Sequence, residues 1–227
     1  MTLPAHDASE GRPDRPRTIS QPLARLARRT VSGDAVSTAR GLLGALLVHE
    51  DALGRRVGRI VETEAYAGPD DRASHARAGR TARTSIMFGP PGRAYVYLVY
   101  GLHHCLNVVC AEDGVAAAVL IRAVEPLEGV ERMRAARGRP GPDPDRLAAG
   151  PARTCQAFGI DRTFDGLDLL SDDRLWLAAP DTGWQPDAIV SGPRVGVDYA
   201  GPDWSNRPWR FGLAGSRALS KPFPVGP

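Results

Sequence analysis

Two strand–turn–strand patterns restrict what this chain can fold into more than any other feature of its 227 residues. In each pattern, two runs rich in valine, leucine, isoleucine and tyrosine flank a short turn, around residues 51–54 and around Gly101. Strands joined by such short turns pair in antiparallel fashion. A later apolar run is expected to end before Pro126, because proline cannot donate a hydrogen bond to a neighbouring strand. Strands are expected at residues 45–48, 57–66, 93–100, 105–110, 116–124, 167–177, 189–197 and 210–213.

Short helices are expected around this sheet. Ser32 or Asp34 is a suitable N-cap for a helix that ends near Leu43. Because no boundary leaves two independent cores, the chain is expected to be α+β, with a single compact domain, a curved, mostly antiparallel sheet and surrounding short helices. The other expected helices are residues 21–30, 128–137 and 151–158. The expected limits are a disordered tail at 1–18, the domain at 19–222, a C-terminal tail at 223–227 and a flexible insertion at 138–145.

The composition argues against several classes of protein. The hydrophobic content of 42% is ordinary for a globular chain, and no apolar run approaches the roughly 18 residues of a membrane span. The N-terminus lacks the apolar segment of a secretory signal. The three cysteines, Cys105, Cys110 and Cys155, do not have a metal-binding spacing, so we expect a reducing cytoplasm and no metal site.

The basic residues are almost all arginine and are unevenly distributed. Lys221 is the only lysine among 29 basic residues, an excess of arginine that GC-rich coding explains in large part. Residues 1–30 account for the net charge of +3, whereas residues 72–93 contain five arginines and no acid. A neutral domain with one basic loop is typical of a surface that binds phosphate groups. The candidates for contacts with a nucleic-acid backbone are Arg77, Arg80 and Arg83.

Two glutamates lie two residues apart in the strand expected at 57–66. Alternate side chains of a strand point the same way, so Glu62, Glu64 and Tyr66 share one face. This face belongs either to an exposed edge strand or to a cleft that the arginine-rich loop helps to enclose. In a partly buried cleft, a glutamate acts as a general base that deprotonates water. A glycosidase that uses both carboxylates is disfavoured, because the two lie side by side rather than across a substrate.

Three tyrosines lie close together on the second strand pair. Tyr95 and Tyr97 alternate onto one face, and Tyr100 lies at the hairpin tip beside Gly101. Tyrosines on strands most often belong to the core, but three hydroxyl groups so close together are hard to satisfy there. A tyrosine at a hairpin tip is suited to wedge into a stack of bases. Asn107 is either a satisfied core amide or a reader of a purine edge.

His75 and Arg122 complete the candidate site. His75 is either an exposed loop residue or a lid that stacks over the face of Glu64 and Tyr66. Arg122 lies in an apolar strand, where a buried arginine needs a carboxylate or a phosphate as partner. We interpret Arg122 as positioning Glu64 and its water, with an ordinary structural ion pair as the alternative. Together these residues indicate a water-activating site that acts on a nucleic-acid base.

Five motifs follow one another along the chain: RIVETEAY at 59–66, MFGPPG at 87–92, YVYLVYG at 95–101, LIRAVEPLEG at 120–129 and GPRVGV at 192–197. Together they resemble the alkyladenine (3-methyladenine, methylpurine) DNA glycosylases of the monomeric mammalian and bacterial type, here a bacterial member. The resemblance covers about residues 34–220.

The resemblance implies base excision repair, in which a damaged purine is flipped out of duplex DNA and its N-glycosidic bond is hydrolysed. Expected substrates are 3-methyladenine, 7-methylguanine, hypoxanthine and ethenoadenine. It also implies no cofactor, a monomer that binds damaged duplex DNA without a membrane, and a cytoplasmic location at the nucleoid. By motif, Glu64 matches the general base, Arg122 the arginine beside the water, Tyr66, His75 and Tyr97 the pocket around the flipped base, Asn107 the residue that disfavours guanine, and Tyr100 the side chain that fills the gap in the duplex.

The nucleophile is expected to be water. A glycosylase that also cuts the strand needs an amine nucleophile, and Lys221 lies in a proline-rich tail that we expect to be far from the motifs. Glu62 is expected to support the site rather than to act as the base. Two alternatives remain: a non-catalytic binder of damaged bases, which the presence of Glu64 disfavours, and a nucleoside or RNA N-glycosyl hydrolase, which the basic loop and Tyr100 disfavour.

Overall fold

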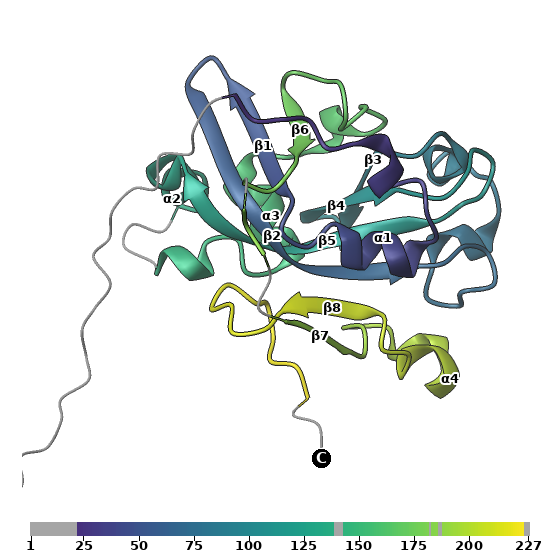
Figure 1. Cartoon of the computed structure of the whole chain (residues 1–227). Coiled ribbons are helices and arrows are strands. Elements are labelled where there is room, and N and C mark those ends of the chain that lie inside the picture. Colours follow the sequence, from purple (N-terminus) through teal and green to yellow (C-terminus); the bar gives the residue numbers. More distant parts are fainter. Residues whose placement is uncertain (1–21, 139–142, 182, 186–187, 225–227) are drawn as a thin grey trace, which may run out of the picture.

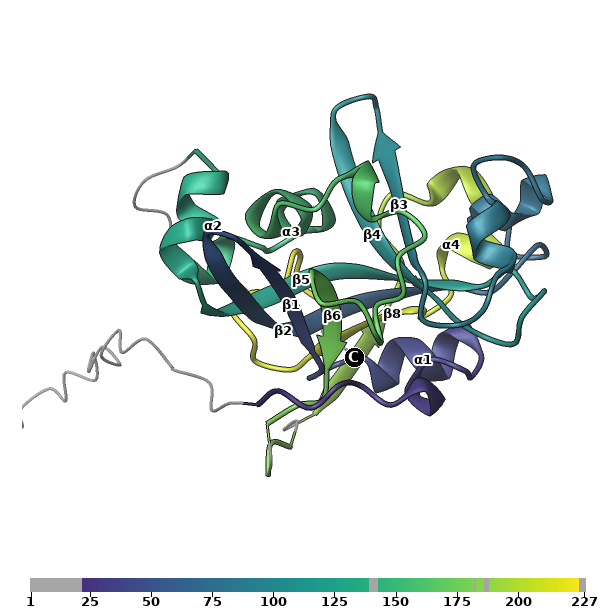
Figure 2. The same ribbon diagram turned by 90° about the horizontal axis from the view of Figure 1, so that it is seen from above.

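The residues that the structure describes form one antiparallel sheet of eight strands (Figure 1 and Figure 2). The computed structural model describes residues 22–138, 143–181, 183–185 and 188–224. Six strands follow the order β3–β4–β5–β2–β1–β6, and β8 pairs with both β2 and β7. The strands are β1 (Leu46–Asp51), β2 (Gly54–Tyr66), β3 (Ala94–Val99), β4 (His103–Val109), β5 (Ala118–Glu128), β6 (Leu175–Ala178), β7 (Ile189–Gly192) and β8 (Arg210–Leu213).

Short helices cover both sides of this sheet. In Figure 1, α1 lies in front of the central strands and α3 behind them, and Figure 2 shows the two on opposite sides. Asp34 caps α1, because its carboxylate accepts hydrogen bonds from the N–H groups of Val36 and Ser37 at 2.9 and 3.0 Å. The helix α3 begins with a proline and ends before Gly159, whose φ of 69° is left-handed. The α-helices of the described residues are α1 (Ala35–Gly41), α2 (Val130–Ala136), α3 (Pro151–Phe158) and α4 (Pro202–Ser205).

One continuous core joins these layers. Leu42 at the C-terminal end of α1, Ile121 of β5 and Phe158 of α3 are fully buried members of the same apolar cluster. This single core confirms the prediction of one compact α+β domain with a mostly antiparallel sheet. Among the described residues, no helix combines the length and the apolar character that crossing a bilayer requires.

The centre of the sheet is formed by β2 and β5, which pair along most of their length. Two of the three register shifts between them are adjacent: Ile60 pairs with Val124 and Glu62 with Ala123, and the next pair is Thr63 with Ile121. One residue of each strand is therefore left over, namely Val61 in β2 and Arg122 in β5. The two bulges compensate each other, so that the strands leave this region in the register in which they entered it. Bulges of this kind redirect a side chain, here that of Arg122.

Several expected boundaries differ from the structure. The strand β5 continues through Pro126 to Glu128, because Pro126 lies at a further register shift. Residues 22–27 do not form a helix but run beside β6, with a bridge between Arg25 and Ala178. Residues 167–174 consist mainly of turns, and β7 ends before Pro193. The tail at 1–18 and residues 139–142 of the expected insertion lie outside the described residues.

Candidate active site

A pocket of about 420 Å³ brings the predicted site residues together. Its walls come from β2 to β5, from the loop at residues 73–87 and from residues 195–199. Its volume falls within the range typical of small-molecule sites. The predicted residues that line it are Glu64, Tyr66, His75, Arg83, Tyr97, Tyr100, Asn107 and Arg122.

Glu64 is fully buried and receives donors from three different segments. Arg122 Nη1 lies 3.1 Å from Glu64 Oε1, and the main-chain N–H of Val195 donates to the same oxygen at 2.7 Å. The Tyr66 hydroxyl donates to Oε2 at 2.9 Å. The alternative that Glu64 lies on an exposed edge strand is wrong, because β2 pairs at Glu64 with β5 on one side and with β8 on the other. This arrangement holds the carboxylate in one orientation in the pocket wall.

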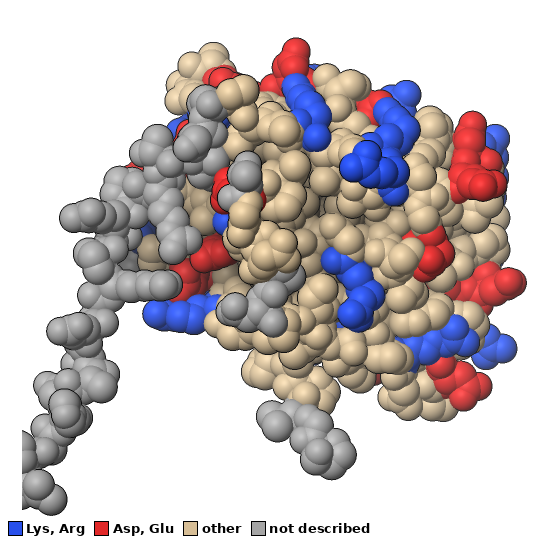
Figure 3. Space-filling model, viewed as in Figure 1, with Lys and Arg blue, Asp and Glu red and all other residues tan. Residues whose placement is uncertain are grey.

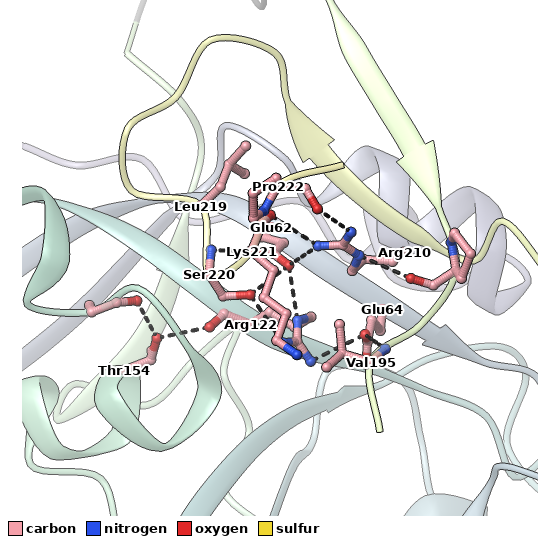
Figure 4. A network of polar contacts seen from close by, with 12 residues as sticks. Glu62, Glu64, Arg122, Thr154, Val195, Arg210, Leu219, Ser220, Lys221 and Pro222 are labelled. Atoms are coloured by element: carbon pink, nitrogen blue, oxygen red, sulfur yellow. Dashed lines mark hydrogen bonds and ion pairs between the residues drawn. The ribbon is translucent and has the colours of Figure 1, made fainter. Parts of the chain in front are cut away.

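Glu62 points to the same side as Glu64 but does not line the pocket. Its Oε1 accepts hydrogen bonds from Arg122 Nε at 3.0 Å and from Arg210 Nη1 at 3.1 Å (Figure 4). Ser220 adds its hydroxyl to Oε1 at 2.8 Å and its N–H to Oε2 at 2.6 Å. The side chain of Arg122 thus lies between two carboxylates, which agrees with the expectation that a buried arginine has an anionic partner.

Aromatic side chains form another wall of the pocket that contains Glu64. The His75 ring meets the Tyr97 ring edge-on, with centroids 4.6 Å apart, and His75 Nδ1 lies 3.0 Å from the Tyr95 hydroxyl. Burial and the nearby Arg83 lower the pKa of His75 to about 4, so the ring is neutral at physiological pH. The buried Asn107 lines the pocket and donates to the Tyr95 carbonyl at 3.1 Å. Asn107 is thus buried at the pocket with its amide nitrogen bonded to the main chain, and its role as a reader of a purine edge stays a prediction.

Tyr66 is held from behind by residues that the sequence analysis did not single out. The guanidinium of Arg194 lies between the rings of Tyr66 and Trp209, 4.9 and 5.1 Å from their centroids. Arg194 also forms a fully buried, bidentate ion pair with Asp71, with contacts of 2.5 and 2.9 Å. The GPRVGV motif contains Arg194, but nothing local in the sequence indicates that Asp71 is its partner. Burial and the neighbouring Glu64 raise the pKa of Tyr66 well above its ordinary value, so its hydroxyl stays a donor.

The tip of the β3–β4 hairpin presents Tyr100 to solvent. This side chain is 92% exposed, and its φ of 51° lies in the left-handed region that non-glycine residues rarely adopt. Leu102 beside it is 76% exposed. The predicted tip position of Tyr100 is therefore confirmed, and the exposed pair forms an apolar projection at the rim of the pocket.

Residues 29–217 match the family model of methylpurine-DNA glycosylase (MPG). The chain belongs to the methylpurine-DNA glycosylase family. A Mus musculus protein named DNA-3-methyladenine glycosylase is 46% identical over 197 residues, which cover 82% of this chain and 58% of the mouse protein. A protein of Anaeromyxobacter dehalogenans strain 2CP-C, with the provisional name 3-methyladenine DNA glycosylase, is 53% identical over 192 residues, 84% of each chain.

Membership confirms the predicted family and enzyme class. As a methylpurine-DNA glycosylase, the protein is an N-glycosyl hydrolase of base excision repair, and DNA is its substrate. The structure adds that the residues matched by motif converge on one pocket, although they come from four strands, the turn between β3 and β4, and the loop that contains His75. Their individual roles are taken up below as proposals.

The three arginines that were predicted to contact a nucleic-acid backbone, Arg77, Arg80 and Arg83, differ in their position relative to the pocket. All three are exposed, but among them only Arg83 lines the pocket, with its guanidinium 5.2 Å from the Tyr97 ring centroid. Arg80 instead packs over the Phe88 ring at 5.3 Å, and Arg77 donates to the Arg72 carbonyl at 3.4 Å. On the face of the glycosylase shown in Figure 3, basic and acidic side chains are interspersed rather than gathered by sign.

The expectation that Lys221 lies far from the motifs is wrong. Its main-chain carbonyl accepts a hydrogen bond from Arg210 Nη1 at 3.2 Å, and the preceding Ser220 contacts Glu62. The reason is the path of the chain after β8, which returns across the carboxylate cluster (Figure 4). The side chain of Lys221 is exposed and does not line the pocket. Water as the nucleophile therefore stays a prediction.

A second hollow, of about 640 Å³, lies elsewhere on the glycosylase. Four aspartates line it, together with two arginines and no aromatic residue. It thus offers no surface for stacking a base and would repel a polyanion. The aspartates are Asp165, Asp168, Asp172 and Asp173.

Proposed function

We propose that this glycosylase flips alkylated or deaminated purines out of duplex DNA and hydrolyses their N-glycosidic bond with a water that Glu64 activates. The class comprises 3-methyladenine, 7-methylguanine, hypoxanthine and ethenoadenine. One observation carries the proposal: a fully buried carboxylate with three fixed donors lies in the wall of a pocket that five tyrosines and a histidine also line. This combination joins a base for deprotonating water to a binding site for a flat ring.

In the proposed reaction, Glu64 takes a proton from water while the water oxygen bonds to C1′ of the deoxyribose. The bond between C1′ and the purine nitrogen breaks, and its electron pair leaves with the purine. A purine alkylated at N3 or N7 carries a positive charge, which this electron pair neutralises, so the base is a good leaving group. Arg122, which contacts Glu64 at 3.1 Å, holds the carboxylate and its water in position. The product is an abasic site.

The aromatic wall favours damaged bases over normal ones. Tyr66, His75 and Tyr97 would enclose the flipped ring, and an electron-poor purine gains more from these π-faces than a normal purine. The neutral state of His75 avoids repulsion between a charged ring and a cationic base. Asn107 would disfavour the exocyclic amine of guanine from the pocket wall.

The hairpin tip and the arginine-rich loop would hold the duplex. Tyr100, at the rim, would fill the gap left by the flipped nucleotide. The exposed Arg77, Arg80 and Arg83 would contact phosphate groups on either side. We further propose that the glycosylase acts as a monomer, since the pocket is complete within one chain, and that it is associated with the nucleoid through its DNA substrate.

The test uses duplex oligonucleotides that contain one hypoxanthine, ethenoadenine or 3-methyladenine. After incubation, half of each sample is heated in alkali, which breaks strands at abasic sites. We expect breaks only after alkali, and we expect Glu64→Gln to lose them while it still binds the duplex. Breaks without alkali would contradict the water mechanism, and Lys221→Ala then shows whether that amine is the nucleophile.

The same experiment separates the alternatives. A non-catalytic binder would retain the duplex without breaks in either sample. A nucleoside or RNA hydrolase would release base from inosine or from an RNA strand but not from duplex DNA. Unchanged excision by Glu64→Gln would contradict the assignment of the general base.

A further inference from the structure

Residues 219–223, which we call the C-terminal strap, cross the buried carboxylate cluster (Figure 4). Ser220 makes the central contacts, since its N–H and its hydroxyl both donate to Glu62, at 2.6 and 2.8 Å. The strap lies beyond residues 29–217, which the family model matches. The contacts of Ser220 with Glu62 therefore come from outside the residues that the family model matches.

Arg210 fastens the strap to the sheet. Its Nη1 and Nη2 donate to the carbonyls of Lys221 and Pro222, at 3.2 and 3.0 Å. The Phe223 ring lies over the same guanidinium, 3.8 Å from its centroid to Cζ. Gly212 makes room for this ring, because a Cβ there would lie 2.6 Å from Phe223 Cε2. The position of Ser220 is thus defined on its C-terminal side by Arg210.

The cluster contains two negative and two positive side chains, and all four are buried. Glu62 and Glu64 are 0% exposed, and Arg122 and Arg210 are 5% and 3% exposed. Arg210 forms its ion pair with Glu62 at 3.1 Å. Because Arg210 supplies a second positive charge to Glu62, the charge of Arg122 remains available to Glu64.

The donors of Arg122 are divided between the two sides of the cluster. Its Nε donates to Glu62 at 3.0 Å and its Nη2 to the Ser220 hydroxyl at 3.0 Å. Its Nη1 is the nitrogen that reaches Glu64 Oε1, at 3.1 Å. A planar guanidinium that is held at two of its three nitrogens cannot rotate, so these two contacts determine where the third nitrogen points.

We propose that Glu62 and Ser220 are positioning residues for excision, because they hold Arg122 so that its Nη1 stays on Glu64. This inference rests on the proposed function, in which Glu64 activates water. Neither residue touches the pocket, and both act through Arg122. A purely structural role would make the cluster important for folding but not for the rate of the folded enzyme.

The test compares single-turnover excision of hypoxanthine from a duplex by wild type, Ser220→Ala, Ser220→Thr and Ser216→Ala. Ser220→Ala is a mild change of a half-buried residue that removes the hydroxyl contacts with Glu62 and Arg122, and we expect the excision rate constant to fall about tenfold, the lower end of what a hydrogen bond to a charged group contributes. Affinity for the duplex should not change. Ser220→Thr keeps the hydroxyl and should restore the rate. Ser216 is the matched control, because its hydroxyl accepts from Ala218 N–H at 3.3 Å, outside the cluster.

A double-mutant cycle with Arg122→Lys distinguishes positioning from folding. Lysine has a single nitrogen and cannot use both contacts, so Ser220→Ala should cost less than about twofold in that background. Melting temperatures of all variants show that the comparison is between folded proteins.

A wild-type rate for Ser220→Ala, or an equal loss in both backgrounds, would overturn the inference. If wild type itself does not excise any lesion, the proposed function fails and this inference fails with it. An active wild type with an unaffected Ser220→Ala contradicts the positioning role alone.

Discussion

Replacing Asp71 with asparagine would remove the negative charge beside the guanidinium of Arg194. Both side chains are 0% exposed, and their two contacts measure 2.5 and 2.9 Å. Asparagine keeps an oxygen that can accept from the N–H of Ala73, which Asp71 accepts at 3.0 Å. Its amide nitrogen, however, cannot replace the oxygen that accepts from the N–H of Ala67 at 3.2 Å, so the change removes the charge together with one main-chain hydrogen bond.

The expected loss of stability is large. Breaking a buried ion pair by removing one partner costs about 3–5 kcal/mol, because the remaining charge is left uncompensated. Arg194 would retain only neutral neighbours, namely the carbonyls of Ala65 and Trp204 and the rings of Tyr66 and Trp209. For a domain of this size, 1 kcal/mol corresponds to about 2–4 °C. We therefore expect a melting temperature about 6–20 °C lower.

The assay is urea unfolding of wild type, Asp71→Asn, Arg194→Met and the double variant, followed by tryptophan fluorescence. The double variant lacks both charges, so it should lose less stability than Asp71→Asn alone. Asp173→Asn serves as control, because the Asp173 side chain is 96% exposed in its contact with Arg25, and it should change stability by less than about 0.5 kcal/mol.

Two results would refute this reasoning. One is a loss below about 1 kcal/mol for Asp71→Asn, which would mean that the charge is not needed to compensate Arg194. The other is a double variant less stable than Asp71→Asn, which would mean that packing of the Arg194 side chain, and not its charge, dominates the energy of this site.

Three further predictions concern other parts of the molecule. Burial lowers the pKa of His75 from 6.5 to about 4, so the neutral ring stabilises the fold above pH 6.5 and this contribution is lost as the pH falls toward 4. In urea unfolding from pH 7 to 4, the free energy of unfolding should therefore decline more steeply for wild type than for His75→Gln. Tyr100→Ala should leave the melting temperature unchanged, because the side chain is 92% exposed, while slowing excision at least about tenfold in single-turnover assays; an unchanged rate would contradict its insertion into the duplex. Gly58→Ala should destabilise the fold by about 1–3 kcal/mol, because a Cβ would lie 2.4 Å from Val124, and a wild-type melting temperature would show that the strands yield easily.

The features that the sequence predicts well depend on local patterns. Alternation along β2 places Glu64 and Tyr66 on one face, and the hydroxyl of one donates to the carboxylate of the other. The turn at Gly101 predicts the hairpin and the exposed tip at Tyr100. The limits of α3 are also predicted, since a proline begins it and a glycine follows it. Each of these signals involves residues only a few positions apart.

The features that the sequence does not predict depend on distant contacts. Ser220 and Glu62 are 158 residues apart, and Asp71 and Arg194 are 123 apart. The position of Lys221 was mispredicted for the same reason, because composition describes a tail but not where it returns. The continuation of β5 through Pro126 requires knowledge of a register shift in a partner strand. The spacing of residues in the sequence does not indicate which distant segments will contact one another in the fold.

The paired bulges at Val61 and Arg122 place Arg122 in the centre of the sheet without changing the register of the strands on either side. Deleting Val61 alone would put one half of β2, either Gly54–Ile60 or Glu62–Tyr66, one position out of register with β5. The side chains of that half would then point to the opposite side of the sheet. Deleting Val61 and Arg122 together would leave both halves matched and would remove the arginine and one buried valine. An arginine at this place in the sheet thus requires one extra residue in each of two paired strands, and neither extra residue alone is compatible with the register on both sides.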